Sequence, residues 1–105
     1  MTPIFRWSGE YFGFLTNTGF LFDARGDYIG WASDGHRVWA ADGSYLGEIV
    51  DANYVLRDIT QPECSPKKPP DEPTTYINLP PRPSARKPHS PRPGHVDALE
   101  KYGHD

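Results

Sequence analysis

The sequence holds a single cysteine, Cys64, and no apolar run that approaches the length of a transmembrane helix. One cysteine excludes an internal disulfide and gives a metal ion no second thiol ligand. The first residues also lack the apolar stretch of a secretory signal, so we expect a cytoplasmic protein that makes no membrane contact. Proline is scarce at first: Pro3 is the only proline in residues 1–59, and the other eleven lie in residues 62–93. The chain therefore divides near residue 60 into a folded head and a proline-rich tail.

Charge divides the chain at the same place. Residues 1–59 carry four arginines against eight acidic side chains, a net charge of −4, whereas the tail has a net charge of +1. An acidic head argues against nucleic acid as its partner. The tail has a basic stretch at Arg82, Arg86, Lys87 and Arg92. A head of about 60 residues is near the lower size limit for independent folding, so we expect an aromatic core, with help from the tail or from a second copy as alternatives.

A seventeen-residue unit occurs three times, from Ile4, Leu21 and Val38, and a fourth unit begins at Val55 before the match stops. Three columns are identical in the first three units: Gly9/Gly26/Gly43, Tyr11/Tyr28/Tyr45 and Gly13/Gly30/Gly47. Three further columns stay apolar: Ile4/Leu21/Val38/Val55, Phe5/Phe22/Trp39/Leu56 and Phe12/Ile29/Leu46. A fixed period of this kind is typical of a repeat architecture.

Each unit predicts a β-hairpin. A short apolar strand leads into a turn whose central glycine, Gly43 in the third unit, adopts the positive φ of a tight hairpin without strain. A longer strand then begins at the tyrosine, and the second glycine column lies inside it. Glycine within a strand usually marks close approach by another group, so we expect an aromatic ring of the neighbouring unit over each of these glycines. The expected donors of that ring are Phe5, Phe22 and Trp39.

Hairpins arranged around a pseudo-fourfold axis would leave few free strand edges. The predicted fold is therefore all-β: a pseudo-fourfold ring of β-hairpins in residues 1–59, followed by an extended proline-rich tail. The fourth unit is incomplete, because no return strand follows Val55 at the expected distance. Residues 76–79, Tyr76-Ile77-Asn78-Leu79, resemble Tyr28-Ile29-Gly30-Trp31 and are predicted to supply that strand after an insertion.

The registered triplets Gly9-Glu10-Tyr11, Gly26-Asp27-Tyr28 and Gly43-Ser44-Tyr45, each followed two residues later by glycine, resemble the pattern of the 4-fold beta flower family of small bacterial proteins. The resemblance covers about residues 4–59, and the tail after the repeats is similar to that of family members. It implies an all-β head with four petals. It implies no activity, because it brings no catalytic residues with it.

The tail, residues 60–95, is predicted to be a proline-rich linker. Leu79-Pro80-Pro81-Arg82-Pro83 favours polyproline II. Three alternatives stay open: a semi-rigid spacer, a segment that docks back onto the head, and a ligand for an aromatic groove of another protein. After the linker, residues 96–102 predict a short helix with Val96, Leu99 and Tyr102 on one side. Because two helical turns are unstable alone, this segment is a candidate docking peptide.

The sequence carries no constellation of catalytic residues, so we expect no enzyme, no cofactor and no metal. Arg25-Gly26-Asp27 matches an adhesion tripeptide, but Gly26 belongs to the turn column, which favours a structural role. His36 is the one histidine of the head, and it has no ligand-type neighbour at a metal-binding spacing.

The positions that break the repeat are better candidates for function. Phe14 and Trp31 share a column with Glu48, so they either form an exposed aromatic pair or are covered by the tail. Together with Pro80, Pro81, Arg82 and Pro83 they make up the predicted binding surface. We expect a non-enzymatic protein-interaction or scaffold module with a protein partner. The alternative is a small-ligand or carbohydrate-binding module that uses clustered aromatic rings. The sequence does not specify the oligomeric state.

Overall fold

The computed structural model describes residues 2–33, 36–62, 65–70, 73, 79–100 and 102. It contains eight strands: β1 (Thr2–Phe5), β2 (Tyr11–Leu15), β3 (Phe20–Asp23), β4 (Tyr28–Ser33), β5 (Arg37–Ala40), β6 (Tyr45–Val50), β7 (Tyr54–Asp58) and β8 (His95–Asp97). The described residues contain no helix, which confirms the all-β prediction.

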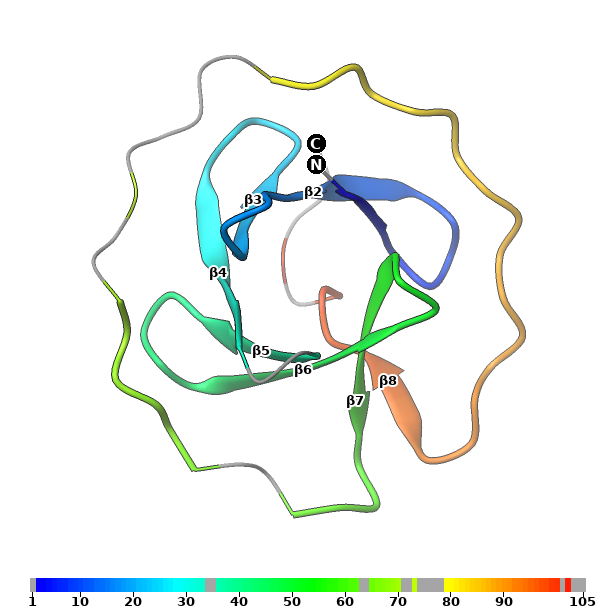
Figure 1. The fold of residues 1–105 in the computed structure, drawn as a ribbon. Helices are drawn as coiled ribbons and strands as arrows, with labels where there is room; N and C mark the ends of the chain where they lie inside the picture. Colours follow the sequence, from blue (N-terminus) through cyan, green and yellow to red (C-terminus); the bar gives the residue numbers. More distant parts are fainter. Residues whose placement is uncertain are drawn as a thin grey trace.

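The strands form a ring that is closed on itself. Each strand pairs antiparallel with the next along the chain, from β1 to β8. β1 and β7 also lie side by side, in parallel, with Phe5 opposite Tyr54. The amide of Phe5 donates a hydrogen bond to the carbonyl of Asn53 at 2.8 Å, and this contact closes the ring of β1–β7 (Figure 1). β8 adds to β7 outside that closure.

The first three hairpins share one register. Ile4 lies opposite Gly13, Leu21 opposite Gly30 and Val38 opposite Gly47. In each hairpin the register shifts immediately after the first of these residues, which increases the local twist of the strand pair. The glycines at the hairpin tips have φ angles of 95°, 89° and 94° at Gly9, Gly26 and Gly43. The turn prediction for this column is confirmed, because those angles suit glycine far better than other residues.

The glycines inside the strands have a different neighbour from the one predicted. A Cβ on Gly13 would overlap the backbone carbonyl of Phe22, and a Cβ on Gly30 would overlap that of Trp39. The expected residue column is therefore the right one, but its backbone occupies the space rather than its aromatic ring. The reason is that β2 pairs with β3 and β4 pairs with β5. The main chain of the next hairpin therefore lies directly beside these glycines.

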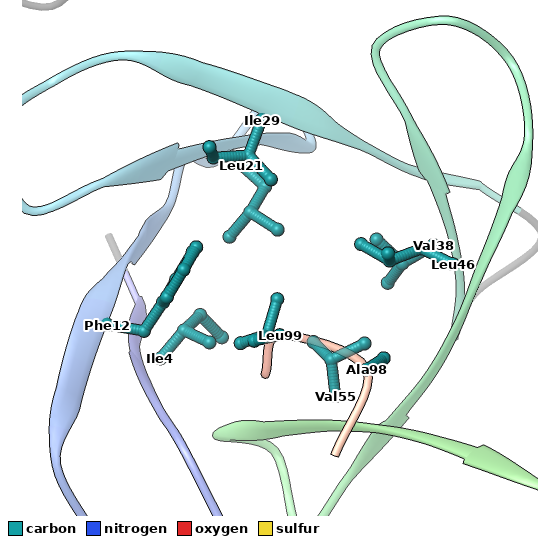
Figure 2. Packing of buried hydrophobic residues seen from close by; sticks show 9 residues of the cluster. All are labelled: Ile4, Phe12, Leu21, Ile29, Val38, Leu46, Val55, Ala98 and Leu99. Atoms are coloured by element: carbon teal, nitrogen blue, oxygen red, sulfur yellow. The ribbon is translucent and has the colours of Figure 1, made fainter. Parts of the chain in front are cut away.

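The core lies on the axis of the ring. The first apolar column of every unit points inward, and Ile4, Leu21, Val38 and Val55 are each at most 1% exposed. Leu99 is fully buried among them, and Figure 2 shows its side chain in the middle of the inward-pointing residues. The remaining members of this cluster are Phe12, Ile29, Leu46 and Ala98.

The fourth hairpin is completed by β8. Its antiparallel register with β7 sets Leu56 opposite Asp97 and Asp58 opposite His95. The strand predicted at residues 76–79 lies outside the described residues except for Leu79, which belongs to no strand. Thirty-six residues separate β7 from β8, whereas short turns join the strands of the other hairpins.

The helix predicted at residues 96–102 is wrong. Residues 95–97 form a strand, and the described residues after it form turns. Helical spacing of Val96, Leu99 and Tyr102 is a weak local preference, whereas pairing with the open edge of β7 satisfies backbone groups that would otherwise stay unpaired. The docking role of the segment does hold, because Leu99 is buried in the core and Tyr102 packs against it.

Buried polar contacts hold this segment in place. The guanidinium of Arg6, which is 4% exposed, donates to the carbonyl of Leu99 at 2.7 Å and to that of Tyr102 at 3.0 Å. The carboxylate of Asp97 accepts from the amide of Trp7 at 2.9 Å and from the amide of Leu99 at 3.0 Å. The turn after β8 is therefore bonded directly to the first hairpin.

Candidate functional site

The tail runs around the outside of the hairpin ring. We name residues 65–93 the strap; its described residues follow the rim past the hairpin tips before the chain returns to β8 (Figure 1). The described parts of the strap, which are residues 65–70, 73 and 79–93, belong to no strand. Among the three alternatives for the tail, the described strap residues correspond to a segment that docks back onto the head.

At the tip of the first hairpin, the backbone of the strap contacts the turn glycine. The amide of Arg86 donates to the carbonyl of Gly9 at 2.8 Å. The carbonyl of Arg86 lies so close to Gly9 that a Cβ there would overlap it. This glycine therefore does two things, because it forms the positive-φ turn and it leaves room for the strap.

The side chain of Arg86 returns to the same hairpin. Its guanidinium carbon lies 4.2 Å from the centroid of the Phe5 ring, a cation–π contact. Its Nη1 also donates to the side-chain oxygen of Asn53 at 3.3 Å. One residue of the strap thus binds the tip through its main chain and its charge.

The tip of the third hairpin holds the strap in the same way. The amide of Lys67 donates to the carbonyl of Gly43 at 2.9 Å, and a Cβ on Gly43 would overlap the carbonyl of Lys67. The ammonium of Lys67 lies 4.8 Å from the centroid of the Trp39 ring and donates to the hydroxyl of Ser33 at 2.9 Å. Phe5 and Trp39 occupy the same column of the repeat, so the two sites use equivalent positions of the head.

Residues beyond Arg86 extend the contact at the first hairpin. The ring of His89 stacks on that of Trp7, with centroids 4.1 Å apart and planes 18° from parallel. The amide of His89 donates to the carbonyl of Trp7 at 3.1 Å, and Trp7 Nε1 donates to the carbonyl of Ser90 at 3.0 Å. These contacts are backbone-directed, as in the recognition of extended proline-containing peptides.

Most of the predicted binding surface comes together where the strap lies against the head. A cavity of about 200 Å³ is lined by Pro3, Tyr11, Phe14, Pro80, Pro81 and Pro83. The guanidinium of Arg82 lies 5.9 Å from the centroid of the Tyr11 ring. The prolines therefore meet Phe14, and Arg82 meets the neighbouring Tyr11, in one contact between strap and head.

Of the two alternatives for Phe14 and Trp31, the exposed aromatic pair is excluded. Phe14 is 1% exposed and Trp31 is 7% exposed. Phe14 stacks on Phe22 at 5.4 Å, and Trp31 stacks on Trp39 at 6.2 Å, so each ring pairs with the neighbouring hairpin. Trp31 does not line the cavity at Phe14. Glu48 stands in the same column opposite Leu56, an aliphatic residue that offers no ring for stacking.

The Arg25-Gly26-Asp27 tip has the structural role expected from the repeat. The carboxylate of Asp23 accepts from the amides of Arg25 and Asp27 at 2.9 and 3.0 Å, which holds the turn from within. Among the described residues, no group of three or more His, Cys, Asp or Glu side chains is placed to bind a metal ion. No helix in the described part of the chain has the length and hydropathy needed to span a membrane.

Two titratable groups, one at the end of β7 and one after β8, have shifted pKa values. Hydrogen bonds from the hydroxyl and amide of Thr60, at 2.5 and 2.9 Å, lower the pKa of Asp58, and His95 across the β7–β8 pair adds a smaller effect in the same direction. Burial raises the pKa of Tyr102, with a smaller contribution from Asp42. Near neutral pH the Asp58 carboxyl is therefore ionised and the Tyr102 hydroxyl keeps its proton.

Comparison of the chain with protein-family models, with curated proteins and with solved structures found no match. The resemblance to the 4-fold beta flower family stays a prediction.

Sequence reasoning missed the residues that fasten the strap. The sequence assigns no role to Lys67 or His89, and it places Arg86 only in the basic stretch of a tail that could be a ligand for another protein. Trp7 has no counterpart in the other units. One signal was readable: Lys67-Lys68-Pro69 and Arg86-Lys87-Pro88 are two basic–Lys–Pro triplets in the same tail. The role of the triplets can be recognised only once the hairpin tips that they contact are known.

Proposed function

We propose that this protein is a non-enzymatic interaction module whose hairpin ring binds an extended, proline-containing basic segment along its rim. In this chain the strap occupies the rim, and a segment of a partner protein would bind in its place. The observation that carries the proposal is the repeated contact at Gly9 and Gly43, where main-chain hydrogen bonding and a cation–π contact coincide. The proposal keeps the cytoplasmic location expected from the sequence.

The energetics favour an exchangeable contact. Each tip supplies one hydrogen bond and one cation–π pair at the surface, together worth about 1–3 kcal/mol. The strap is held by several such contacts in series, whereas the core at Leu99 is held by burial. A tethered strap also has a high effective concentration, so a partner must match several contacts to displace it.

The alternative of a small-ligand or carbohydrate-binding module is less favoured. Such a module needs accessible aromatic faces on which sugars stack. Here Trp31, Trp39 and Tyr45 pack together and are each at most 7% exposed, and Trp7 stacks on His89. These rings are already used within the chain.

The test uses the full chain and a labelled synthetic peptide with the sequence of residues 65–93. The double variant Lys67→Glu/Arg86→Glu weakens the chain's own strap at both tips, and we expect it to bind the peptide at least about tenfold more tightly than the wild type. Fluorescence anisotropy measures the affinity, and circular dichroism checks that the fold is retained.

The matched control is Lys68→Glu/Lys87→Glu, which makes the same charge change at the neighbouring exposed residues. It should bind the peptide as weakly as the wild type does. Absence of binding to every variant, at millimolar peptide, would contradict the proposed function.

A further inference from the structure

Two similar triplets of the strap contact the tips of the first and third hairpins. Lys67-Lys68-Pro69 lies at Gly43, and Arg86-Lys87-Pro88 lies at Gly9. In each triplet the first residue makes the contact with the tip. The shared sequence and the shared contacts together indicate that the ring recognises a defined pattern rather than basic charge in general.

The first position of the triplet needs two properties. It must have an amide hydrogen, because that group donates to the glycine carbonyl, so proline cannot stand there. It must also carry a cation on a long side chain, because the charge lies over the ring of Phe5 or Trp39. Lysine and arginine both meet these conditions, and each is used once.

The second and third positions act through the backbone. Lys68 and Lys87 are exposed. A proline in the third position biases the residue before it toward an extended conformation, which keeps the chain running along the rim. Pro69 also approaches the tip directly, since its Cγ and Cδ lie 3.4 Å from the position of a Cβ on Gly43. The proline therefore sets the direction in which the segment leaves the contact.

The spacing of the triplets fits the dimensions of the ring. Lys67 and Arg86 are nineteen residues apart, and an extended chain that rises about 3.1 Å per residue covers about 59 Å over that distance. The molecule measures 37 × 35 Å across its two longer axes, so half of its perimeter is about 57 Å. The tips of the first and third hairpins lie on opposite sides of the ring (Figure 1). A much shorter spacer could not follow the rim from one tip to the other.

We infer that the ring recognises two basic–X–Pro triplets whose first residues lie about nineteen positions apart, and that its partner is a proline-rich protein segment with this pattern. This inference rests on the proposed function and specifies its ligand. It predicts that the spacing and the first residue of each triplet determine affinity, whereas the lysine in the second position does not.

The test measures binding of four synthetic peptides to the full-length Lys67→Glu/Arg86→Glu protein by isothermal titration calorimetry at physiological salt. The first peptide has the sequence of residues 65–93. The second carries Glu at the positions of Lys67 and Arg86, and the third carries Glu at the positions of Lys68 and Lys87. The fourth keeps both triplets but has six residues removed between them.

We expect the first and third peptides to bind within about threefold of each other. The second peptide should lose at least about thirtyfold, and the shortened peptide at least about tenfold, because it can no longer follow the rim between the two tips. Equal binding of all four peptides would overturn the recognition pattern while the proposed function stands. Absence of binding by the first peptide would overturn both. The same four peptides are also titrated into the protein variant Lys67→Ser/Arg86→Ser. The same order of affinities would show that the introduced glutamates do not cause the result.

Discussion

Arg6 and Leu99 are 93 residues apart in the sequence, yet the guanidinium of Arg6 donates to the carbonyl of Leu99 at 2.7 Å. Arg6 lies directly after β1, and Leu99 is the residue on the axis of the ring. The same guanidinium bonds the carbonyl of Tyr102 and lies 5.1 Å from the centroid of the Phe12 ring. A buried cation in the first hairpin thus fastens the segment that completes the fourth.

Replacement of Arg6 by methionine should lower the free energy of unfolding by about 2–3 kcal/mol, because one buried and one partly buried carbonyl lose a charged donor. Urea unfolding followed by tryptophan fluorescence measures the change. Arg25→Met is the control: its side chain is 65% exposed, so we expect a change within about 0.5 kcal/mol. Equal effects of the two substitutions would show that the buried bonds contribute little.

Leu99→Ala should destabilise the protein by about 2–5 kcal/mol, because it leaves a cavity at the centre of the core. Val96, three residues earlier on β8, is 42% exposed, and Val96→Ala should cost under about 1 kcal/mol. Thermal unfolding monitored by circular dichroism compares the two variants. A similar melting temperature for both would mean that Leu99 does not fill the ring.

The turn between β6 and β7 offers a stabilising change. Ala52 has a φ of 66°, a conformation that costs alanine about 1–2 kcal/mol and glycine almost nothing. Ala52→Gly should therefore raise the free energy of unfolding by about 0.5–1 kcal/mol, even though glycine makes the unfolded chain more flexible. Ala41→Gly, at an exposed turn residue with negative φ, should instead lower it slightly. A loss of stability in Ala52→Gly contradicts the turn geometry.

The strap should open locally without unfolding of the core. In Arg86→Glu the cation–π contact with Phe5 is lost, and the amide of residue 86 should exchange its hydrogen about 5–30 times faster, which corresponds to about 1–2 kcal/mol. Hydrogen exchange followed by NMR measures this rate together with the rates of β3 and β4, which should stay unchanged. Lys87→Glu serves as the matched control and should leave the exchange of the Arg86 amide within about twofold. Uniform acceleration across all strands would indicate global destabilisation instead.

Stability should fall at alkaline pH in part through Tyr102. Burial raises the pKa of its hydroxyl in the folded state, so the folded protein resists ionisation that the unfolded chain undergoes freely. This contribution is complete below the ordinary tyrosine pKa of about 10 and is lost as the pH rises through the raised value. Denaturant unfolding at several pH values between about 8 and 11 measures it. The fall should be smaller in Tyr102→Phe, and an identical pH dependence would show that the hydroxyl is not desolvated.

The local parts of the fold were predictable from the sequence. Turn glycines such as Gly43 have a direct backbone requirement, and the inward column represented by Leu21 alternates with outward residues as strands demand. Both signals lie within a single unit, so reading them requires no knowledge of distant contacts. The all-β ring follows from repeating them.

The completion of the fourth hairpin, the burial of Phe14 and Trp31, and the docking of the strap depend on contacts between distant residues, which local patterns do not encode. The spacing of Val96, Leu99 and Tyr102 favoured a helix, but the open edge of β7 recruits Val96 into a strand. The column of Phe14 and Trp31 could be solvated or covered, and only the neighbouring hairpins decide that question. The strap was ambiguous for the same reason, because its prolines suit a spacer as well as a docked segment.

The parallel contact between Phe5 and Tyr54 also bears on the speed of folding. Each hairpin can form early, since its residues are close in sequence, but ring closure must join strands about fifty residues apart, and β8 must then find β7 across a further long loop. Chains dominated by such distant pairings fold in about milliseconds to seconds rather than microseconds. Ring closure and the pairing of β8 are therefore the expected slow steps of folding.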